Sequence, residues 1–135
     1  MRALDTNVLV RFLVQDDDKQ VAIVDQLFSE AEKNKESLYL TSLVVLELMW
    51  VLKASYKVER GDILTAVGEL LNMPVLKFQD QSALRSFVVE AADNNFDLSD
   101  LLIGQIAQAA ACENTLTFDK KAAKSDYFKM LALQS

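Results

Sequence analysis

Apolar residues follow two alternating patterns along the chain, and together these predict an order of elements. Short apolar runs at residues 3–4, 38–40, 75–78 and 116–118 are each followed by polar residues, which is typical of buried strands. Between these runs apolar residues return every three or four positions, which predicts helices. The predicted helices lie around residues 8–13, 21–31, 43–52, 62–71, 80–95 and 101–111, and a last edge strand is predicted over Leu131 to Leu133.

Strands that alternate with helices throughout predict an α/β fold. We expect a mainly parallel sheet of four or five short strands, with helices on both faces. At 135 residues the chain is long enough for one domain with a core and too short for two typical ones. No internal repeat, low-complexity tract or Gly/Ser linker interrupts the sequence. A single domain over residues 1–135 is therefore predicted.

The stretch from Leu43 to Leu52 is apolar except for Glu47. A helix that is apolar on nearly every face is predicted to be buried, and Glu47 is then expected to be buried with it. A lone carboxylate in an apolar interior is costly unless a cation or hydrogen-bond donors meet it. Glu47 lies too far into the helix for a capping role, because a cap belongs to the first turn. The remaining alternative to a ligand is a buried ion pair with a lysine or arginine.

Three aspartates lie in comparable settings. Asp5 and Asp119 each follow an apolar run that is predicted to be a strand, and Asp100 stands at the start of a predicted helix. The carboxyl ends of parallel strands form the edge at which open α/β sheets bind ligands, and the helix dipole favours a charged Asp100. Capping is the simpler alternative for Asp5, and also for Asp97, whose spacing from Asp100 is that of a capping box.

We expect four acids to point at one divalent metal site: Asp5, Glu47, Asp100 and Asp119. Four carboxylates brought within a few ångströms repel one another, and without a cation some of them would hold protons at neutral pH. The chain has no histidine, which disfavours zinc and catalytic triads built on imidazole, whereas carboxylate oxygens suit Mg²⁺ or Mn²⁺. Such an ion can bind a phosphate oxygen and activate water for in-line attack.

Charge and composition limit the partners and the compartment. The net charge of −6 argues against broad affinity for nucleic acid, although bound dications would cancel part of it in place. Cys112 is the single cysteine, so no internal disulfide can form. Apolar stretches are too short for a membrane span, and Asp5 stands where a signal peptide needs its apolar core. A cytoplasmic protein without a membrane segment is predicted.

Four segments resemble the signature segments of PIN domains, in order and over nearly the whole chain. They are Leu4-Asp5-Thr6-Asn7-Val8-Leu9, the helix with Glu47, Asp97-Leu98-Ser99-Asp100-Leu101-Leu102-Ile103, and Thr117-Phe118-Asp119-Lys120. In size and in its short N-terminus the chain is similar to VapC-type toxins. The resemblance implies a PIN-like three-layer sandwich, an Mg²⁺- or Mn²⁺-dependent endoribonuclease, a homodimer, and neutralisation by a cognate antitoxin of VapB type.

Carried over position by position, the acidic quartet of the family matches Asp5, Glu47, Asp100 and Asp119. The resemblance implies that these acids hold the metal, with Glu47 as a ligand either directly or through water. Asp97 matches an acid often found three residues before the third member of the quartet, and is a supporting residue. Asn7 and Thr117 match polar positions that would orient ligands or water.

The resemblance predicts hydrolysis of RNA phosphodiester bonds, and two alternatives stay open. A phosphotransferase of aspartyl-phosphate type would use Asp5 as its nucleophile, but such sites usually carry a second acid two residues on, where this chain has Asn7. A non-catalytic PIN-like binding module would use the acids structurally. Nearby basic residues either guide phosphates or are ordinary surface charges: Arg11, Lys53, Lys120, Lys121 and Lys124.

Overall fold

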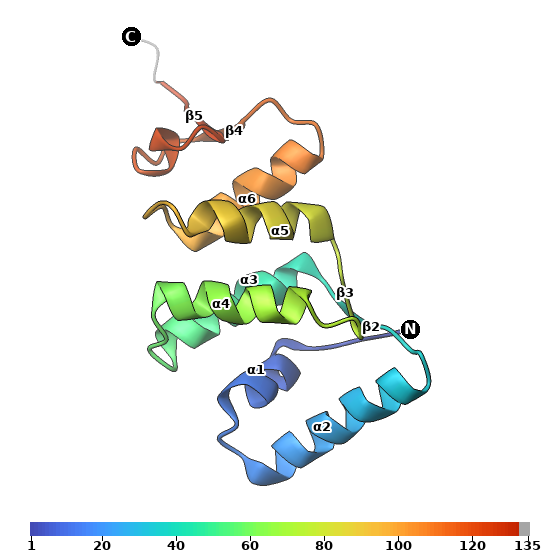
Figure 1. Ribbon diagram of the computed structural model, residues 1–135. Coiled ribbons are helices and arrows are strands. Elements are labelled where there is room, and N and C mark those ends of the chain that lie inside the picture. Colours follow the sequence, from blue (N-terminus) through green and yellow to red (C-terminus); the bar gives the residue numbers. More distant parts are fainter. Residues whose placement is uncertain (133–135) are drawn as a thin grey trace. The chain divides into compact units, whose positions relative to one another are not determined.

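Strands and helices alternate as predicted in the computed structural model, which describes residues 1–132 (Figure 1). The strands are β1 (Arg2–Ala3), β2 (Leu38–Leu40), β3 (Leu76–Phe78), β4 (Thr115–Thr117) and β5 (Phe128–Met130). The helices are α1 (Thr6–Val14), α2 (Asp18–Lys33), α3 (Ser42–Ala54), α4 (Arg60–Leu71), α5 (Gln81–Ala91) and α6 (Leu98–Ala109), and a short 3₁₀ helix, η1, covers Ala122–Lys124. The contacts divide the chain into two compact units, Met1–Gln81 and a second that begins at Ser82.

The first unit is built on a parallel sheet with strand order β1-β2-β3. A pair of helices connects each strand to the next, as parallel pairing requires. In the middle strand, Leu38 and Leu40 are fully buried. The turn after this strand starts α3, because the Thr41 hydroxyl accepts a hydrogen bond from the backbone N–H of Val44 at 3.3 Å. Thr41 is therefore the N-cap of α3.

The second unit contains α5, α6 and a two-stranded parallel sheet, in which Thr115 pairs with Phe128 and Thr117 with Met130. Its core consists of side chains from the two helices: Leu84, Phe87, Leu101 and Leu102. The α/β class and the parallel direction of the strands are thus confirmed. Hydrogen bonds distribute the strands of residues 1–132 over a three-stranded and a two-stranded sheet. No helix in this described range is long and apolar enough to cross a membrane.

The prediction that α3 is buried on nearly all sides is wrong. Leu43 is 76% exposed and Trp50 63% exposed, and Glu47 is exposed between them. Leu43 and Glu47 are four residues apart, and Glu47 and Trp50 are three apart. Residues at these spacings lie along one stripe of a helix, so the three side chains share the exposed face. The opposite side is buried, through Val45, Leu48, Met49 and Leu52. Apolar composition predicts the average burial of a helix, but not which stripe stays open.

Two boundaries also differ from the prediction. The last strand is β5, and Leu131 follows it, while the predicted end at Leu133 lies outside the described residues. Its position is set by pairing with β4, which sequence pattern does not reveal. α5 ends at Ala91 rather than at residue 95, because the Asn94 side chain donates to the carbonyl of Glu90 at 3.1 Å and accepts from the backbone N–H of Phe96.

Candidate active site

Asp5 lies where the chain leaves the first strand. The backbone N–H of Leu4 still bonds to the carbonyl of Tyr39, at 2.9 Å, so the sheet ladder ends immediately before Asp5. Asp5 is the N-cap of α1, and its Oδ1 accepts a hydrogen bond from the backbone N–H of Thr6 at 2.8 Å. The capping interpretation is confirmed, but a carboxylate has a second oxygen, and this side chain is exposed. Capping and ligand binding are therefore compatible at Asp5.

The two residues after Asp5 differ in burial. Asn7 is exposed in the first turn of α1, whereas Thr6 is only 5% exposed. Within the described residues the hydroxyl of Thr6 is buried and makes no hydrogen bond. Such an orphaned group is uncommon and costs about 1–3 kcal/mol. The sequence does not mark this property of Thr6, because no pattern of neighbouring residues distinguishes an unpaired buried hydroxyl from a satisfied one.

Glu47 is the sixth residue of α3, well beyond the first turn. Its carboxylate is exposed, and within residues 1–81 it makes no hydrogen bond or ion pair. The alternative of a buried ion pair with a lysine or arginine of this unit is therefore wrong. Both carboxylate oxygens of Glu47 stay available to a ligand.

In the second unit, three aspartates act on one another. Asp97 is the N-cap of α6, and its Oδ1 accepts a hydrogen bond from the backbone N–H of Asp100 at 3.0 Å, so its predicted capping role is confirmed. Asp100 lies half-buried in the first turn of that helix. Burial raises the pKa of the Asp100 carboxyl, and the negative charges of Asp97 and Asp119 raise it further. The unit thus brings Asp100 within electrostatic reach of both other acids.

Asp119 is fixed by hydrogen bonds at the end of β4. Its backbone N–H donates to the hydroxyl of Thr117 at 2.9 Å. Its Oδ1 accepts from the backbone N–H groups of Lys121 at 2.8 Å and Ala122 at 3.4 Å, so the side chain also holds the start of η1. Thr117, which the resemblance implied as an orienting residue, therefore contacts the backbone of an acid of the quartet.

The PIN domain family matches residues 2–126, a range that includes every acid described above. The chain belongs to the PIN domain family. It is also 35% identical over 91 residues to a VapC ribonuclease of Aquifex aeolicus (strain VF5), an alignment that covers 67% of this chain and 64% of the relative. The chain thus spans less than two thirds of that relative's length.

The donor atoms of this PIN domain fit a hard dication. Near Asp100 they are carboxylate oxygens. Burial and then the charges of Asp97 and Asp119 raise the pKa of Asp100, and a bound cation would offset both effects. Zinc would favour nitrogen and sulfur ligands, and the chain has no histidine. Within residues 1–132 no group of three or more His, Cys, Asp or Glu side chains is placed to hold a metal ion. Neither unit by itself shows a complete metal site.

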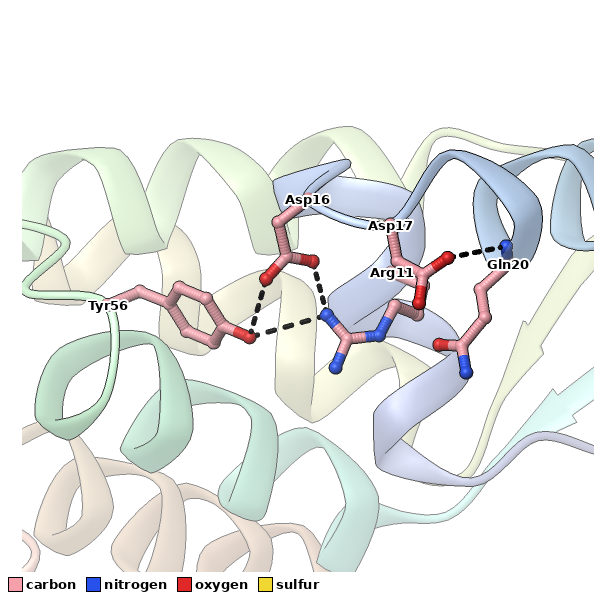
Figure 2. A network of polar contacts seen from close by, with 5 residues as sticks. All are labelled: Arg11, Asp16, Asp17, Gln20 and Tyr56. Carbon is pink, nitrogen blue, oxygen red and sulfur yellow. Dashed lines mark hydrogen bonds and ion pairs between the residues drawn. The ribbon is translucent and has the colours of Figure 1, made fainter.

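A polar network in the first unit of the PIN domain accounts for one candidate phosphate-binding residue (Figure 2). The guanidinium of Arg11 forms an ion pair with Asp16, and Tyr56 donates its hydroxyl hydrogen to the same carboxylate at 3.2 Å. Asp17 is the N-cap of α2 and accepts from the backbone N–H of Gln20 at 3.1 Å. The network joins the end of α1 to the segment after α3, which favours a structural role for Arg11.

Proposed function

We propose that this PIN domain is an Mg²⁺- or Mn²⁺-dependent endoribonuclease that hydrolyses RNA phosphodiester bonds, and that it is the toxin of a type II toxin-antitoxin pair. Membership of the family and the likeness to a VapC ribonuclease support this function. The structural observation that carries the proposal is the position of Asp100, half-buried at the start of α6 and within electrostatic reach of Asp97 and Asp119. Carboxylate oxygens are the usual ligands of a hard metal ion.

Each acid has a role in this proposal. Asp5, Asp100 and Asp119 hold the metal, and Glu47 binds it directly or through water. When bound, the dication would supply positive charge for a phosphate oxygen and activate a water molecule for attack on phosphorus. No histidine base is then required.

The supporting residues hold these acids in place. Asp97 fixes the first turn of α6 by accepting from the backbone N–H of Asp100, and Thr117 fixes the turn of Asp119 by accepting from its N–H. One oxygen of Asp119 is occupied by backbone donors, which leaves its Oδ2 for a ligand. Asn7, exposed in the first turn of α1, orients substrate or water.

The decisive experiment compares the wild type with Asp5→Asn on defined RNAs, using antitoxin-free protein, with Mn²⁺ and with chelator. The asparagine oxygen can still accept from the backbone N–H of Thr6, so the cap and the fold persist. We expect the wild type to cleave only with metal, and Asp5→Asn to lose about 100-fold or more of the rate. A wild type that cleaves no RNA with Mg²⁺ or Mn²⁺ would contradict the proposal.

The same variant separates the two alternative functions. A phosphotransferase would leave a phosphoryl group on Asp5 that mass spectrometry detects in the wild type and not in Asp5→Asn. A binding module would keep its growth effect in cells after this substitution. Asn7, at the position where such phosphotransferases carry a second acid, weighs against the first alternative.

Partners and location form part of the same proposal, and the likeness to a VapC ribonuclease supports the antitoxin partner. We infer a cognate VapB-type antitoxin that neutralises the enzyme, a homodimer, no membrane association, and a cytoplasmic location. Light scattering on the purified protein tests the dimer, since a monomer would show the 15.1 kDa of a single chain. Relief of growth arrest by the co-expressed antitoxin tests the pair.

A further inference from the structure

A buried glutamine lies at the centre of a hydrogen-bond network in the second unit. Gln105, on α6, is only 6% exposed. Its Nε2 donates to Oε2 of Glu90, on α5, at 2.7 Å, and to the hydroxyl oxygen of Tyr127, immediately before β5, at 2.8 Å. Tyr127 donates its own hydroxyl hydrogen to the same oxygen of Glu90. One carboxylate oxygen thus joins α5, α6 and the start of β5; we call these three residues the Glu90 network.

Burial, followed by the hydrogen bond to Glu90, raises the pKa of Tyr127 to about 12. The hydroxyl therefore keeps its proton throughout the physiological range and remains a donor.

A second contact, made by Gly104, holds α6 against Tyr127. A Cβ added to Gly104 would lie 2.6 Å from Cβ of Tyr127 and 3.2 Å from the ring of Phe128. α6 therefore approaches the start of β5 as closely as a glycine permits. The backbone contact at Gly104 and the side-chain bonds at Gln105 are independent of each other, and both locate α6 relative to Tyr127.

These contacts join α6, which carries Asp100, to the start of β5, the partner of the strand that precedes Asp119. Asp100 lies in the first turn of α6, five residues before Gln105. Tyr127 leads into β5, whose parallel partner β4 ends two residues before Asp119. A shift of α6 along or around its axis, relative to β4 and β5, would change the separation of Asp100 and Asp119.

We propose that Glu90, Gln105 and Tyr127 are positioning residues that hold Asp100 and Asp119 at the separation required to bind a dication. This inference rests on the proposed function and names residues that act through the acids rather than on substrate. Gln105 is buried and its two partners are half-buried, and a polar network whose members are satisfied rigidifies the packing of the elements that it joins. A displacement of about 1 Å at a reacting centre can lower a rate by about 100-fold.

The test uses Tyr127→Phe, which removes the hydroxyl and keeps the ring against Gly104. Mn²⁺ affinity of the RNA-free protein, measured by calorimetry, is expected to weaken about tenfold, as is usual when an outer-shell partner is lost. With RNA, kcat is expected to fall while KM stays near the wild-type value. Glu90→Gln should retain the wild-type affinity, because an amide oxygen can accept both hydrogen bonds that one carboxylate oxygen now accepts.

A matched control separates positioning from general destabilisation. Val88→Ala removes part of a half-buried side chain from α5, and Val88 makes none of the bonds of the Glu90 network. If Val88→Ala lowers the Tm as far as Tyr127→Phe does and weakens Mn²⁺ binding equally, the inference is wrong. It is also wrong if Tyr127→Phe binds Mn²⁺ like a wild type that both binds metal and cleaves RNA. A wild type that neither binds Mn²⁺ nor cleaves RNA would overturn the proposed function and this inference together.

Discussion

Ionisation of the Asp100 carboxyl lowers the stability of the metal-free fold. Because its pKa is raised in the folded state, the folded protein holds this proton more tightly than the unfolded chain does. The ionised carboxyl therefore destabilises the fold at neutral pH, and the penalty disappears as the pH falls below the ordinary value of 3.8. We expect Asp100→Asn to melt at a higher temperature than the wild type at pH 7 in chelator, with the difference closing towards pH 3.

Thermal melts across this pH range measure the effect, and added Mn²⁺ provides the control. The ion should raise the Tm of the wild type more than that of Asp100→Asn, since the variant lacks one of the charges that bind it. A variant that melts below the wild type at pH 7 in chelator would show that Asp100 is stabilised by the helix start rather than crowded by its neighbours.

Asp119 holds the start of η1, and two substitutions separate this structural role from the catalytic role proposed for it. Asn in this position can still accept from the backbone N–H groups of Lys121 and Ala122, whereas Ala cannot. We expect Asp119→Asn to keep the wild-type Tm and to lose about 100-fold or more of the cleavage rate. Asp119→Ala should lose the same activity and, in addition, about 1 kcal/mol of stability. Equal melting temperatures for the two variants would argue against the capping role.

Sequence reasoning located single residues well where a local pattern marks them. Asp5 and Asp119 each stand two residues after the end of a strand, and Asp97 caps α6 with the spacing of a capping box. The Glu90 network left no such mark, because its members are separated by 15 to 37 positions along the chain. A glutamine within an apolar helix segment, Gln105, is visible in the sequence, but its partners are decided by packing.

At the scale of elements, Gly61 and Gly104 are two helical glycines in different surroundings, and they provide a matched pair. Gly104 lies in α6, where an added Cβ would be 2.6 Å from Tyr127, whereas a Cβ on Gly61 in α4 would meet nothing within 4 Å. Alanine is favoured over glycine in a helix by up to about 1 kcal/mol, so Gly61→Ala should stabilise the protein. Gly104→Ala should lose about 1–2 kcal/mol, because the steric conflict exceeds that gain.

Chemical unfolding curves for the two variants test this pair. If Gly104→Ala stabilises the fold as much as Gly61→Ala does, α6 can move away from Tyr127 at no cost. The close approach would then no longer support a fixed position for this helix.

Element type was easier to predict than element environment. The helix α3 was indicated by its apolar residues, and β2 by a short apolar run bounded by polar residues. The exposed stripe of α3 was not indicated by the sequence. Nine of the ten residues from 43 to 52 are apolar, so no periodicity distinguishes the buried face from the exposed one. The position of β5 depended on its hydrogen-bond partner, Thr115–Thr117, which is distant in sequence.

The whole chain divides into two units by contacts, and the PIN match at residues 2–126 spans both of them. A single domain over residues 1–135 stays a prediction, as does the joint use of Asp5 and Glu47 from one unit with Asp100 and Asp119 from the other. Local pattern placed these acids at strand ends and helix starts. Their convergence depends on contacts between distant segments, which no local pattern contains.

At the scale of the whole molecule, net charge sets the long-range attraction expected between the protein and RNA. The chain carries 20 acidic and 14 basic residues, so long-range attraction to phosphate is weak without a bound cation. We expect RNA to bind poorly in chelator and at least about tenfold more tightly with Ca²⁺, an oxygen-binding dication that can stand in for Mn²⁺ during a binding measurement. Fluorescence anisotropy measures the affinity, and a gel confirms that the RNA stays intact.

The salt dependence of the same measurement identifies where the attraction comes from. If the bound dication provides most of the attraction, the protein neutralises few phosphates itself. The plot of log affinity against log salt should then have a shallow slope, because each neutralised phosphate adds roughly −0.7 to the slope on a single strand. Tight binding in chelator with a steep slope would contradict the metal-centred interpretation. It would instead assign RNA binding to the exposed lysines after β4, Lys120, Lys121 and Lys124, and their replacement by glutamine would then lower both affinity and slope.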